Sequence, residues 1–452
     1  MNVCVDSVIA ATAAVVRRPD LLPKEFVLST DTRSLQPGQT YLALRGEQFD
    51  GHDYVALALG KGACGVIVER PESVPDGVAA LVVPDTKRAY MQIAREARKR
   101  WHGRAVAITG SAGKTTTKAF LQQLLCAIYG DRRVYASPGN ENNELGVSKL
   151  LFALQPQHEF AVIEMGARHP GEIAELVEIS LPDVGVLTNI GEAHLEIFGS
   201  RETLAATKWG LFSHGAQAVL NADDAESRAR AKTLDAPPRW FGTGEGPERG
   251  TWLNGDSLVI TDEGEPRSYG VQVPFPGAHN RANLAAAIAG ARALGADGET
   301  LAEAAATLRL PAGRYERMML RNGVVLIYDA YNANLSGMIA TLDAFAHENA
   351  AHRIAVLSSM AELGAEALSM HRRVGEHAAR ANLDTLLVGG DFAEDLAAGA
   401  EAAGFPPDRI VEFRGNHDAA TWLRDNTRSG DVVLLKGSRK YKLEEIVEGL
   451  RG

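Results

Sequence analysis

Residues 105–117, AVAITGSAGKTTT, combine the residue types that bind a polyphosphate. An apolar, β-prone run enters a small glycine-rich turn, and a helix-like pattern follows the lysine and the threonines. In such a strand–loop–helix unit the backbone N–H groups and the helix dipole point at one place, which favours an anion. Lys114 adds a positive charge for the terminal phosphates, and Thr115 adds a hydroxyl group for Mg²⁺. The predicted phosphate-binding residues are Gly110, Ser111, Ala112, Gly113, Lys114, Thr115 and Thr116.

The spacing of this loop departs from the usual Walker A pattern. That pattern has a glycine five residues before the glycine that precedes the lysine, and here Ile108 occupies the position. The alternative explanation is a glycine-rich turn between a strand and a helix, with a lysine there by chance. Because the flanking strand and helix patterns fit a phosphate loop, phosphate binding is the better interpretation.

Two further groups with metal-binding chemistry follow predicted buried strands. Residues 160–163 form a strand that ends at Glu164, and residues 184–187 form another that is followed by His194. In a parallel sheet both groups lie near the phosphate loop, at the edge where α/β proteins bind ligands. Oxygen and nitrogen atoms there are reasonable metal ligands. By position alone, His194 is equally well a loop histidine with a structural hydrogen bond.

Two residues on predicted helices have simpler explanations than function. Lys208 lies in the helical stretch 201–212, and the periodicity of that stretch favours a solvated surface lysine. Asn283 precedes an alanine-rich helix predicted over 284–294, where an asparagine often merely caps the helix. With the histidine and asparagine just before it, Asn283 could instead frame the edge of an adenine.

Polar loops near the N-terminus suggest a second binding region. Asp31, Thr32, Arg33 and Gly46 lie in loops beside a predicted strand over residues 40–44. Loops of this composition at strand ends can hold a nucleotide diphosphate or a sugar. Ordinary solvated turns explain the same weak signal more simply when it is taken alone.

The C-terminal part has a similar polar edge. Asp329 ends a strand predicted over 324–328, and Lys436-Gly-Ser-Arg439 follows a strand predicted over 432–435. The second loop places two cations and a hydroxyl group at one strand end, which makes a cradle for a carboxylate or a phosphate.

The elements that position these groups alternate between strand and helix, which predicts α/β domains with parallel sheets. A length of 452 residues suggests about three domains. We expect a small α/β substrate domain over 1–98, a central P-loop ATPase-like domain with a parallel sheet over 99–315, and a doubly wound, Rossmann-like domain over 316–452.

Composition excludes several classes of protein. The formal net charge is −10 and no basic stretch offsets it, which argues against nucleic acid as a partner. Cys4, Cys64 and Cys126 are far apart and have no metal-binding spacing, so they read as reduced thiols of the cytosol. No apolar run approaches the roughly 20 residues that span a bilayer, and no signal peptide is recognisable. We expect a cytoplasmic monomer.

Taken in order, these loops resemble those of the Mur ligases, the ATP-dependent amino-acid ligases of peptidoglycan precursor synthesis. The chain is most similar to the members that join D-alanyl-D-alanine to UDP-N-acetylmuramoyl-tripeptide. Some positions depart from the expected pattern: Ser148 and Leu335 replace prolines, and Ser358-Ser359 replaces a Gly-Asp pair. The stretches that carry the resemblance are DTRSLQPGQTYLALRGEQFDGHDY, GNENNELG, EMGARHPGEI, DAYNAN and KGSRKYKLEEI.

The resemblance implies that ATP phosphorylates the tripeptide carboxylate and that the dipeptide amine then attacks the acyl phosphate. It implies that Lys114 bridges the β- and γ-phosphates, and that two Mg²⁺ ions are held by Thr115, Glu164, His194 and a carbamylated Lys208. Arg314 would reach the γ-phosphate, Asn283 the adenine and Asp329 the ribose. Asp31, Thr32, Arg33 and Gly46 would lie near the uridine diphosphate. Weaker candidates for the peptide and the dipeptide are Asn142, Asn143, Asn332, Ser336, Lys436, Ser438 and Arg439.

Two other functions compete with this interpretation. The family member that adds the third amino acid would carry an Asp-Asn-Pro-Arg type motif in its last domain, and none is found. A regulatory P-loop ATPase would hydrolyse ATP without a murein substrate, but it gives no reason for the positions of Lys208 and Arg314.

Overall fold

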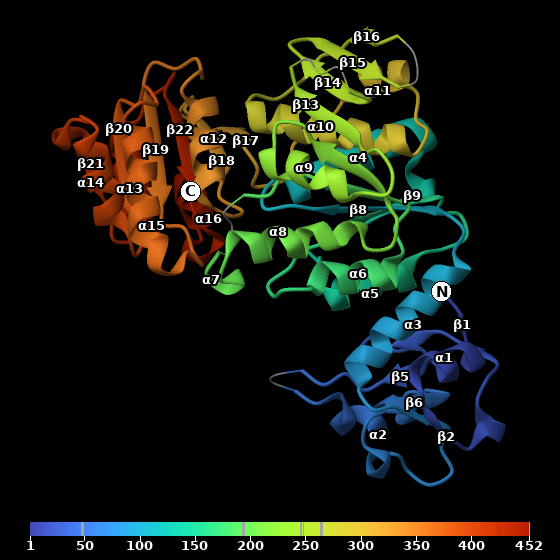
Figure 1. Cartoon of the computed structure of the whole chain (residues 1–452). Coiled ribbons are helices and arrows are strands. Elements are labelled where there is room, and N and C mark those ends of the chain that lie inside the picture. Colours follow the sequence, from blue (N-terminus) through green and yellow to red (C-terminus); the bar gives the residue numbers. More distant parts are fainter. Residues whose placement is uncertain (47–48, 192–194, 245, 247, 263–264, 452) are drawn as a thin grey trace.

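The computed structural model describes residues 1–46, 49–191, 195–244, 246, 248–262 and 265–451. The chain forms three α/β units that follow one another along the sequence (Figure 1). The N-terminal unit extends away from the central one, whereas the third unit lies against the central unit's other side. The predicted α/β class with three domains is confirmed.

The N-terminal unit holds a two-stranded sheet, β1–β3, and a five-stranded sheet in the order β2-β7-β6-β5-β4. Within the larger sheet only β2 runs antiparallel, and its Val15 is 67% exposed because β2 is an edge strand. The elements are β1 (Val3–Cys4), α1 (Val5–Thr12), β2 (Val15–Arg17), β3 (Glu25–Phe26), β4 (Leu28–Ser29), β5 (Thr40–Leu42), α2 (Val55–Gly60), β6 (Gly65–Val68) and β7 (Ala80–Val82).

Helix α3 (Thr86–Arg100) joins this unit to the central one. Its N-terminus is capped by Asp85, whose side chain accepts a hydrogen bond from the backbone N–H of Arg88. At its other end the buried Arg98 donates through Nε to the Ser180 carbonyl at 2.8 Å and through Nη2 to the Leu181 carbonyl at 3.0 Å. These bonds satisfy carbonyl groups at the C-terminal end of a helix in the central unit and so anchor α3 to that unit.

The central unit is built on a nine-stranded sheet in the order β16-β15-β14-β13-β12-β11-β8-β10-β9. Strands β8 to β14 pair in parallel, and β15 and β16 add an antiparallel edge. The strands are β8 (Arg104–Thr109), β9 (Val134–Ala136), β10 (Phe160–Glu164), β11 (Val184–Leu187), β12 (Gln217–Asn221), β13 (Arg239–Thr243), β14 (Gly250–Asn254), β15 (Ser257–Thr261) and β16 (Arg267–Gly270). The helices are α4 (Lys114–Tyr129), α5 (Glu144–Ala153), α6 (Glu172–Ser180), α7 (Leu195–Phe198), α8 (Arg201–Trp209), α9 (Ala225–Arg230), α10 (Ala278–Ala293) and α11 (Gly298–Ala305).

Strand β8 is buried on both faces because helices cover both sides of this sheet. Val106 and Ile108 point into the core formed with α4 and α10, whereas Ala105 and Ala107 point into the core formed with α5 and α6. This alternation explains why β8 reads as a continuous apolar run. Its central position places the loop after β8 between the ends of β10 and β11.

The third unit has a six-stranded sheet in the order β17-β18-β22-β19-β20-β21, parallel except for β17. Helices cover both faces, as the two apolar clusters of this unit show. The elements are β17 (Glu316–Met319), β18 (Val325–Asp329), α12 (Leu335–Phe345), β19 (Arg353–Ser358), α13 (Ala367–Ala378), β20 (Thr385–Gly389), α14 (Ala393–Ala402), β21 (Ile410–Glu412), α15 (Asn416–Asn426), β22 (Val432–Lys436) and α16 (Glu444–Arg451).

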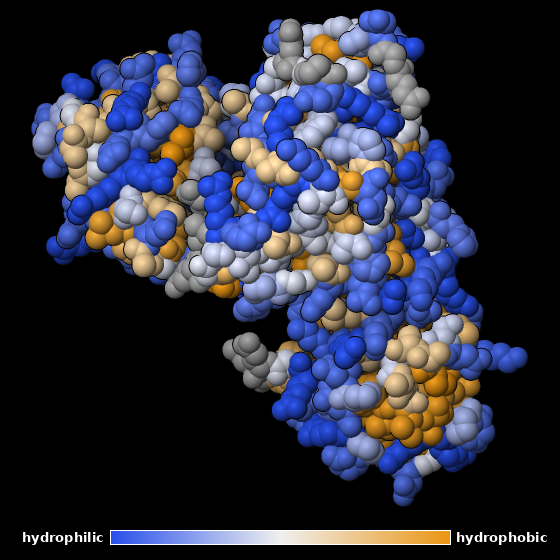
Figure 2. All heavy atoms as spheres, viewed as in Figure 1, coloured by the Kyte–Doolittle hydropathy of each residue, from blue (hydrophilic) through white to orange (hydrophobic). Residues whose placement is uncertain are grey.

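The surface in Figure 2 is mostly hydrophilic over the central and third units, with an apolar area on the N-terminal unit. Within the described parts of the chain, no helix is both long and apolar enough to cross a membrane. The three cysteines are free thiols in the structure.

Candidate active site

The phosphate loop has the geometry that its sequence predicts. It leaves the C-terminal end of β8 and enters α4 at Lys114, after Gly113 with φ of +82°. No side chain in the described part of the chain caps α4, so the N–H groups of its first turn are available to a ligand. A Cβ atom on Gly113 would lie 2.2 Å from Oδ1 of Asn283, which places the predicted adenine-binding Asn283 directly against the loop.

Two residues that follow β11 hold the loop in place, and the sequence analysis assigned them no role. Thr188 donates through Oγ1 to the Ala112 carbonyl at 2.6 Å, and Oδ1 of Asn189 accepts from the Ala112 N–H at 3.0 Å. The Ser111 hydroxyl in turn accepts from the Gly191 N–H at 2.9 Å. The sequence did contain a signal for this role. Strands β8 and β11 are parallel neighbours, and polar residues that follow the ends of such strands lie close together.

Lys114 is a half-buried cation whose partner in the structure is a carbonyl of its own loop. Its Nζ donates to the Gly110 carbonyl at 2.7 Å. Burial lowers the pKa of Lys114 from its ordinary value; the charge of Arg314 lowers it further, while Glu164 opposes the shift. Arg314 therefore lies within electrostatic reach of the phosphate loop, as a shared nucleotide site requires.

Glu164 is at the centre of a hydrogen-bonded network at the end of β10, where it is 1% exposed. Its Oε1 accepts from the Thr115 hydroxyl at 3.2 Å and from Nδ2 of Asn142 at 2.9 Å. Its Oε2 pairs with the Lys118 ammonium at 3.1 Å, and Lys118 also donates to the Gly139 carbonyl at 2.5 Å. The sequence analysis missed Lys118 because a lysine on a helix gives no signal of burial.

The oxygen atoms of Thr115 and Glu164 fit a hard divalent cation, which prefers hydroxyl and carboxylate ligands. Among the described residues, no three His, Cys, Asp or Glu side chains gather into a metal site. The predicted ligand His194 lies outside the described residues. The predicted magnesium site therefore rests on the Thr115–Glu164 pair.

We expect Lys118→Met to destabilise the protein, because it leaves the buried Glu164 carboxylate without its cation. Breaking such a buried pair costs about 3–5 kcal/mol. Denaturant unfolding followed by tryptophan fluorescence measures the loss. The matched control is Lys149→Met, which removes an ion pair to Glu141 from a side chain that is 64% exposed and should change the midpoint little. Equal midpoints for the two variants would contradict the structural role of Lys118.

Lys208 is buried, and the interpretation from periodicity as a solvated surface lysine is wrong. It lies in the last turn of α8 and is 3% exposed, because α8 packs that face against the core of the central unit. Burial lowers its pKa well below the ordinary value, and the charge of Lys114 adds to the effect. No other described residue forms a hydrogen bond or an ion pair with its Nζ.

In the third unit, Asp329 and Lys436 form a buried ion pair. They end the neighbouring strands β18 and β22, and Nζ of Lys436 lies 3.0 Å from Oδ2 of Asp329. The Thr341 hydroxyl donates to the same oxygen, and Lys436 also donates to the Asn332 carbonyl at 3.1 Å. Burial lowers the pKa of His279 in the central unit, and the Asp329 carboxylate partly opposes this shift across the boundary between the units.

Several predicted substrate residues have structural partners. Asn143 caps α5 by accepting from the Gly146 N–H, and Ser438 caps the turn after β22 by accepting from the Lys440 N–H. Ser336 donates to Oδ1 of Asn334, which itself caps α12.

The predicted substrate residues of the N-terminal unit also have partners within the chain. The Asp31 carboxylate forms an ion pair with the exposed Arg33. The backbone carbonyl of Thr32 accepts a hydrogen bond from the Lys61 ammonium, and the backbone N–H of Gly46 donates to the Phe49 carbonyl.

The serine pair that departs from the expected Gly-Asp is fully buried. The Ser359 hydroxyl accepts from the Phe392 N–H at 2.9 Å, which ties the end of β19 to the loop after β20. Ser359 therefore acts as a structural link.

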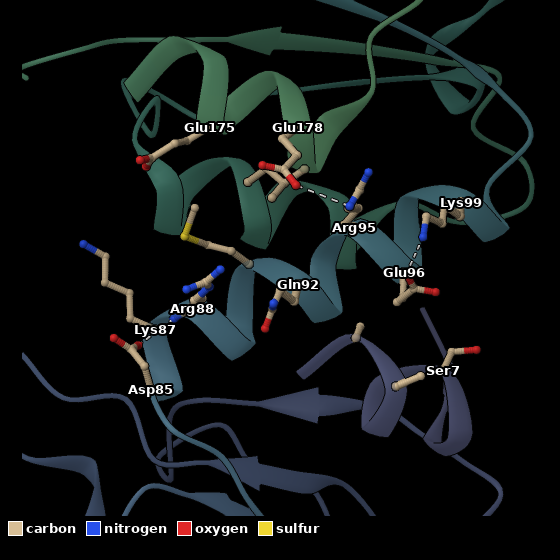
Figure 3. Close-up of a pocket in the computed structure, with 14 residues that line it drawn as sticks. Ser7, Asp85, Lys87, Arg88, Gln92, Arg95, Glu96, Lys99, Glu175 and Glu178 are labelled. Carbon is tan, nitrogen blue, oxygen red and sulfur yellow. Dashed lines mark hydrogen bonds and ion pairs between the residues drawn. The ribbon is translucent and has the colours of Figure 1, made fainter. Parts of the chain in front are cut away.

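A groove of about 840 Å³ lies apart from these residues, along α3 and between α1 and α6 (Figure 3). Its floor carries charged side chains of both signs, such as Arg95, which reaches Glu178 of α6 at 3.4 Å. None of the predicted site residues that the structure describes lines it.

Comparison with known proteins places the whole chain in one group. The Mur ligase family catalytic domain matches residues 27–109, the Mur ligase middle domain residues 108–291, and the Mur ligase glutamate ligase domain residues 313–439. The UDP-N-acetylmuramoyl-tripeptide–D-alanyl-D-alanine ligases of Synechocystis sp. and Escherichia coli are 37% and 33% identical to it. Each match covers 94% of this chain, and 91% and 93% of those proteins respectively.

Solved structures agree with these matches. A crystal structure of MurF from Acinetobacter baumannii superposes with a TM-score of 0.87 at 29% identity and covers 100% of this chain and 99% of that one. The MurF ligase from Thermotoga maritima in complex with ADP gives a TM-score of 0.79 at 29% identity, over 94% of this chain and 97% of that one.

Proposed function

The chain belongs to the Mur ligase family, and from that membership we infer that it joins D-alanyl-D-alanine to UDP-N-acetylmuramoyl-tripeptide while converting ATP to ADP and phosphate. The observation that carries this function is the match to ligases of that name along all three units. The protein is thus an ATP-dependent ligase of peptidoglycan precursor synthesis. Its product is the pentapeptide precursor.

The reaction has an electrostatic problem, because a carboxylate must approach the γ-phosphate of ATP. Enzymes of this kind solve it mainly by positioning reactants and placing cations around the transferred group. We propose that Lys114 and Arg314 supply that charge, since Arg314 lies close enough to Lys114 to lower its pKa. The dipeptide amine then attacks the acyl phosphate, and the tetrahedral intermediate collapses to an amide and phosphate.

ATP is expected to lie between the central and third units. Its phosphates would meet the uncapped N-terminus of α4, and its adenine would lie near Asn283, which touches the same loop. Asp329 would bind the ribose from the third unit. Mg²⁺ would be held by Thr115 and Glu164, with His194 and a carbamylated Lys208 near a second ion, and it would neutralise charge that develops on the phosphates.

The two other substrates would occupy the remaining polar loops. We propose that Asp31, Thr32, Arg33 and Gly46 lie near the uridine diphosphate. The peptide and the dipeptide would then contact Asn142, Asn332 and Arg439, with Asn143, Ser336, Lys436 and Ser438 shaping the loops that carry them. The reaction belongs to the cytoplasmic stage of wall synthesis, and we expect a monomer.

The test is phosphate release by the purified protein with ATP, Mg²⁺ and UDP-N-acetylmuramoyl-tripeptides that contain diaminopimelate or lysine. Phosphate release is expected only when D-alanyl-D-alanine is added as well. A product heavier by the dipeptide minus water, seen by mass spectrometry, identifies the amide. Hydrolysis of ATP without the murein substrate, or ligation of a free diamino acid in place of the dipeptide, would contradict the proposal.

A further inference from the structure

The ring of Tyr331 lies beside two arginines that come from different segments of the chain. The Cζ atom of Arg314 is 4.7 Å from the ring centroid, and that of Arg439 is 5.4 Å away. Tyr331 follows β18, Arg314 precedes β17, and Arg439 follows β22. Because β17 pairs antiparallel with β18, all three residues lie at the same edge of the sheet.

The backbone around Arg314 is fixed rather than free. The next residue, Tyr315, has φ of +50°, which is unfavourable for a bulky side chain. Tyr315 is held there because it is 4% exposed in the core of the third unit and because its hydroxyl donates to Oε1 of Glu348 at 3.2 Å. The Tyr331 N–H also donates to the Gly313 carbonyl at 3.3 Å. Backbone strain that the fold maintains next to a charged side chain indicates that the position of Arg314 matters.

Two lysines lie within electrostatic reach of Arg314, and each has a carboxylate beside it: Glu164 for Lys114 and Asp329 for Lys436. The charge of Arg314 lowers the pKa of both Lys114 and Lys436, each of which is shifted mainly by burial. Its buried Nε has no hydrogen-bond partner among the described residues. The two lysines repel the guanidinium, and the nearby Asp329 carboxylate is already paired with Lys436, so a further attractive contact helps to hold Arg314 in place. The electron-rich face of an aromatic ring provides one.

We propose that Tyr331 is a positioning residue, whose ring holds Arg314 for the γ-phosphate and Arg439 for the carboxylate of the incoming dipeptide. The inference rests on the proposed function. It adds one aromatic ring that contacts both the arginine for ATP and the arginine for the dipeptide. One ring thereby sets the places of two cations that would otherwise separate.

The test compares Tyr331→Leu with Tyr331→Phe, because phenylalanine keeps the ring and leucine removes it. For Tyr331→Leu we expect kcat/KM to fall about tenfold for ATP, because the half-buried Arg314 loses its ring contact, and about threefold for D-alanyl-D-alanine, because the contact of the exposed Arg439 is weaker. Tyr331→Phe should recover most of both values. Affinity for the ATP analogue AMPPNP should fall about tenfold in the leucine variant, whereas affinity for ADP, which lacks the γ-phosphate, should change less than twofold.

Tyr129→Leu is the matched control, because Arg133 lies 5.6 Å from that ring at the far end of α4. It should leave both kcat/KM values unchanged. Wild-type kinetics in Tyr331→Leu, or equal losses in the phenylalanine and leucine variants, would overturn the proposal. Equal losses of AMPPNP and ADP affinity would also overturn it, because they indicate a general structural defect. Failure of the proposed function is distinguishable: the wild-type protein would then release no phosphate in response to the dipeptide, while the AMPPNP and ADP affinities still test the ring.

Discussion

Replacing Lys114 by alanine should abolish ligation, with kcat/KM falling by at least about a thousandfold. The Lys114 side chain makes no ion pair with a described residue and donates only to the carbonyl of Gly110 in its own loop. Its charge is therefore available to the phosphates. The loss should be kinetic rather than structural, because Lys114 is only half-buried and because its attraction to Glu164 is offset by repulsion from Arg314 and Lys208. Phosphate release measures the first effect, and thermal unfolding should show an unchanged or slightly higher midpoint.

The control for Lys114→Ala is Lys149→Ala, which removes an exposed lysine and should keep wild-type kinetics. Tight binding of AMPPNP by Lys114→Ala together with ligation within a few-fold of the wild-type rate would rule out the assignment of Lys114 to the phosphates.

Lys208→Ala should also inactivate the protein, and short carboxylates such as formate or acetate should restore part of the activity. Burial lowers the pKa of Lys208 well below its ordinary value, so the neutral amine is favoured, and only a neutral amine can add CO₂ to give a carbamate. The carbamate is an anion that can act as a ligand of Mg²⁺, and an added carboxylate can replace it. Because more of the amine is protonated as pH falls, depletion of CO₂ should reduce wild-type activity more on the acidic side of the activity profile.

The same carboxylates should not restore Lys114→Ala, which lacks a cation rather than an anion. A fully active Lys208→Ala, together with an unmodified lysine in a ligand-bound crystal structure, would show that Lys208 serves only packing.

The sequence predicted the elements that carry the phosphate site. Its apolar run, glycine-rich turn and lysine gave β8, the loop and α4, because these features are local and each has one favoured conformation. The strand ending at Glu164 was predicted for the same reason: a buried parallel strand is a short apolar run that ends where polar residues begin.

Side-chain burial could not be predicted in the same way. Lys118 and Lys208 both read as ordinary helix lysines, because periodicity describes one helix and not what packs against it. Only the neighbouring elements decide that Lys118 meets Glu164, or that Lys208 faces the core beside Lys114.

The sequence by itself determined the three α/β units, the phosphate loop and the strand ends that carry polar residues, since all of these follow from composition and short-range periodicity. Tertiary structure alone decided which of those strand ends meet. The contacting residues in the pairs Thr115–Glu164 and Asp329–Lys436, and in the contacts of the Tyr331 ring with Arg314 and Arg439, are between 17 and 108 positions apart. Such contacts arise from the order of strands in the sheets. That order depends on the packing of the whole unit, so it cannot be predicted from any short segment of the sequence.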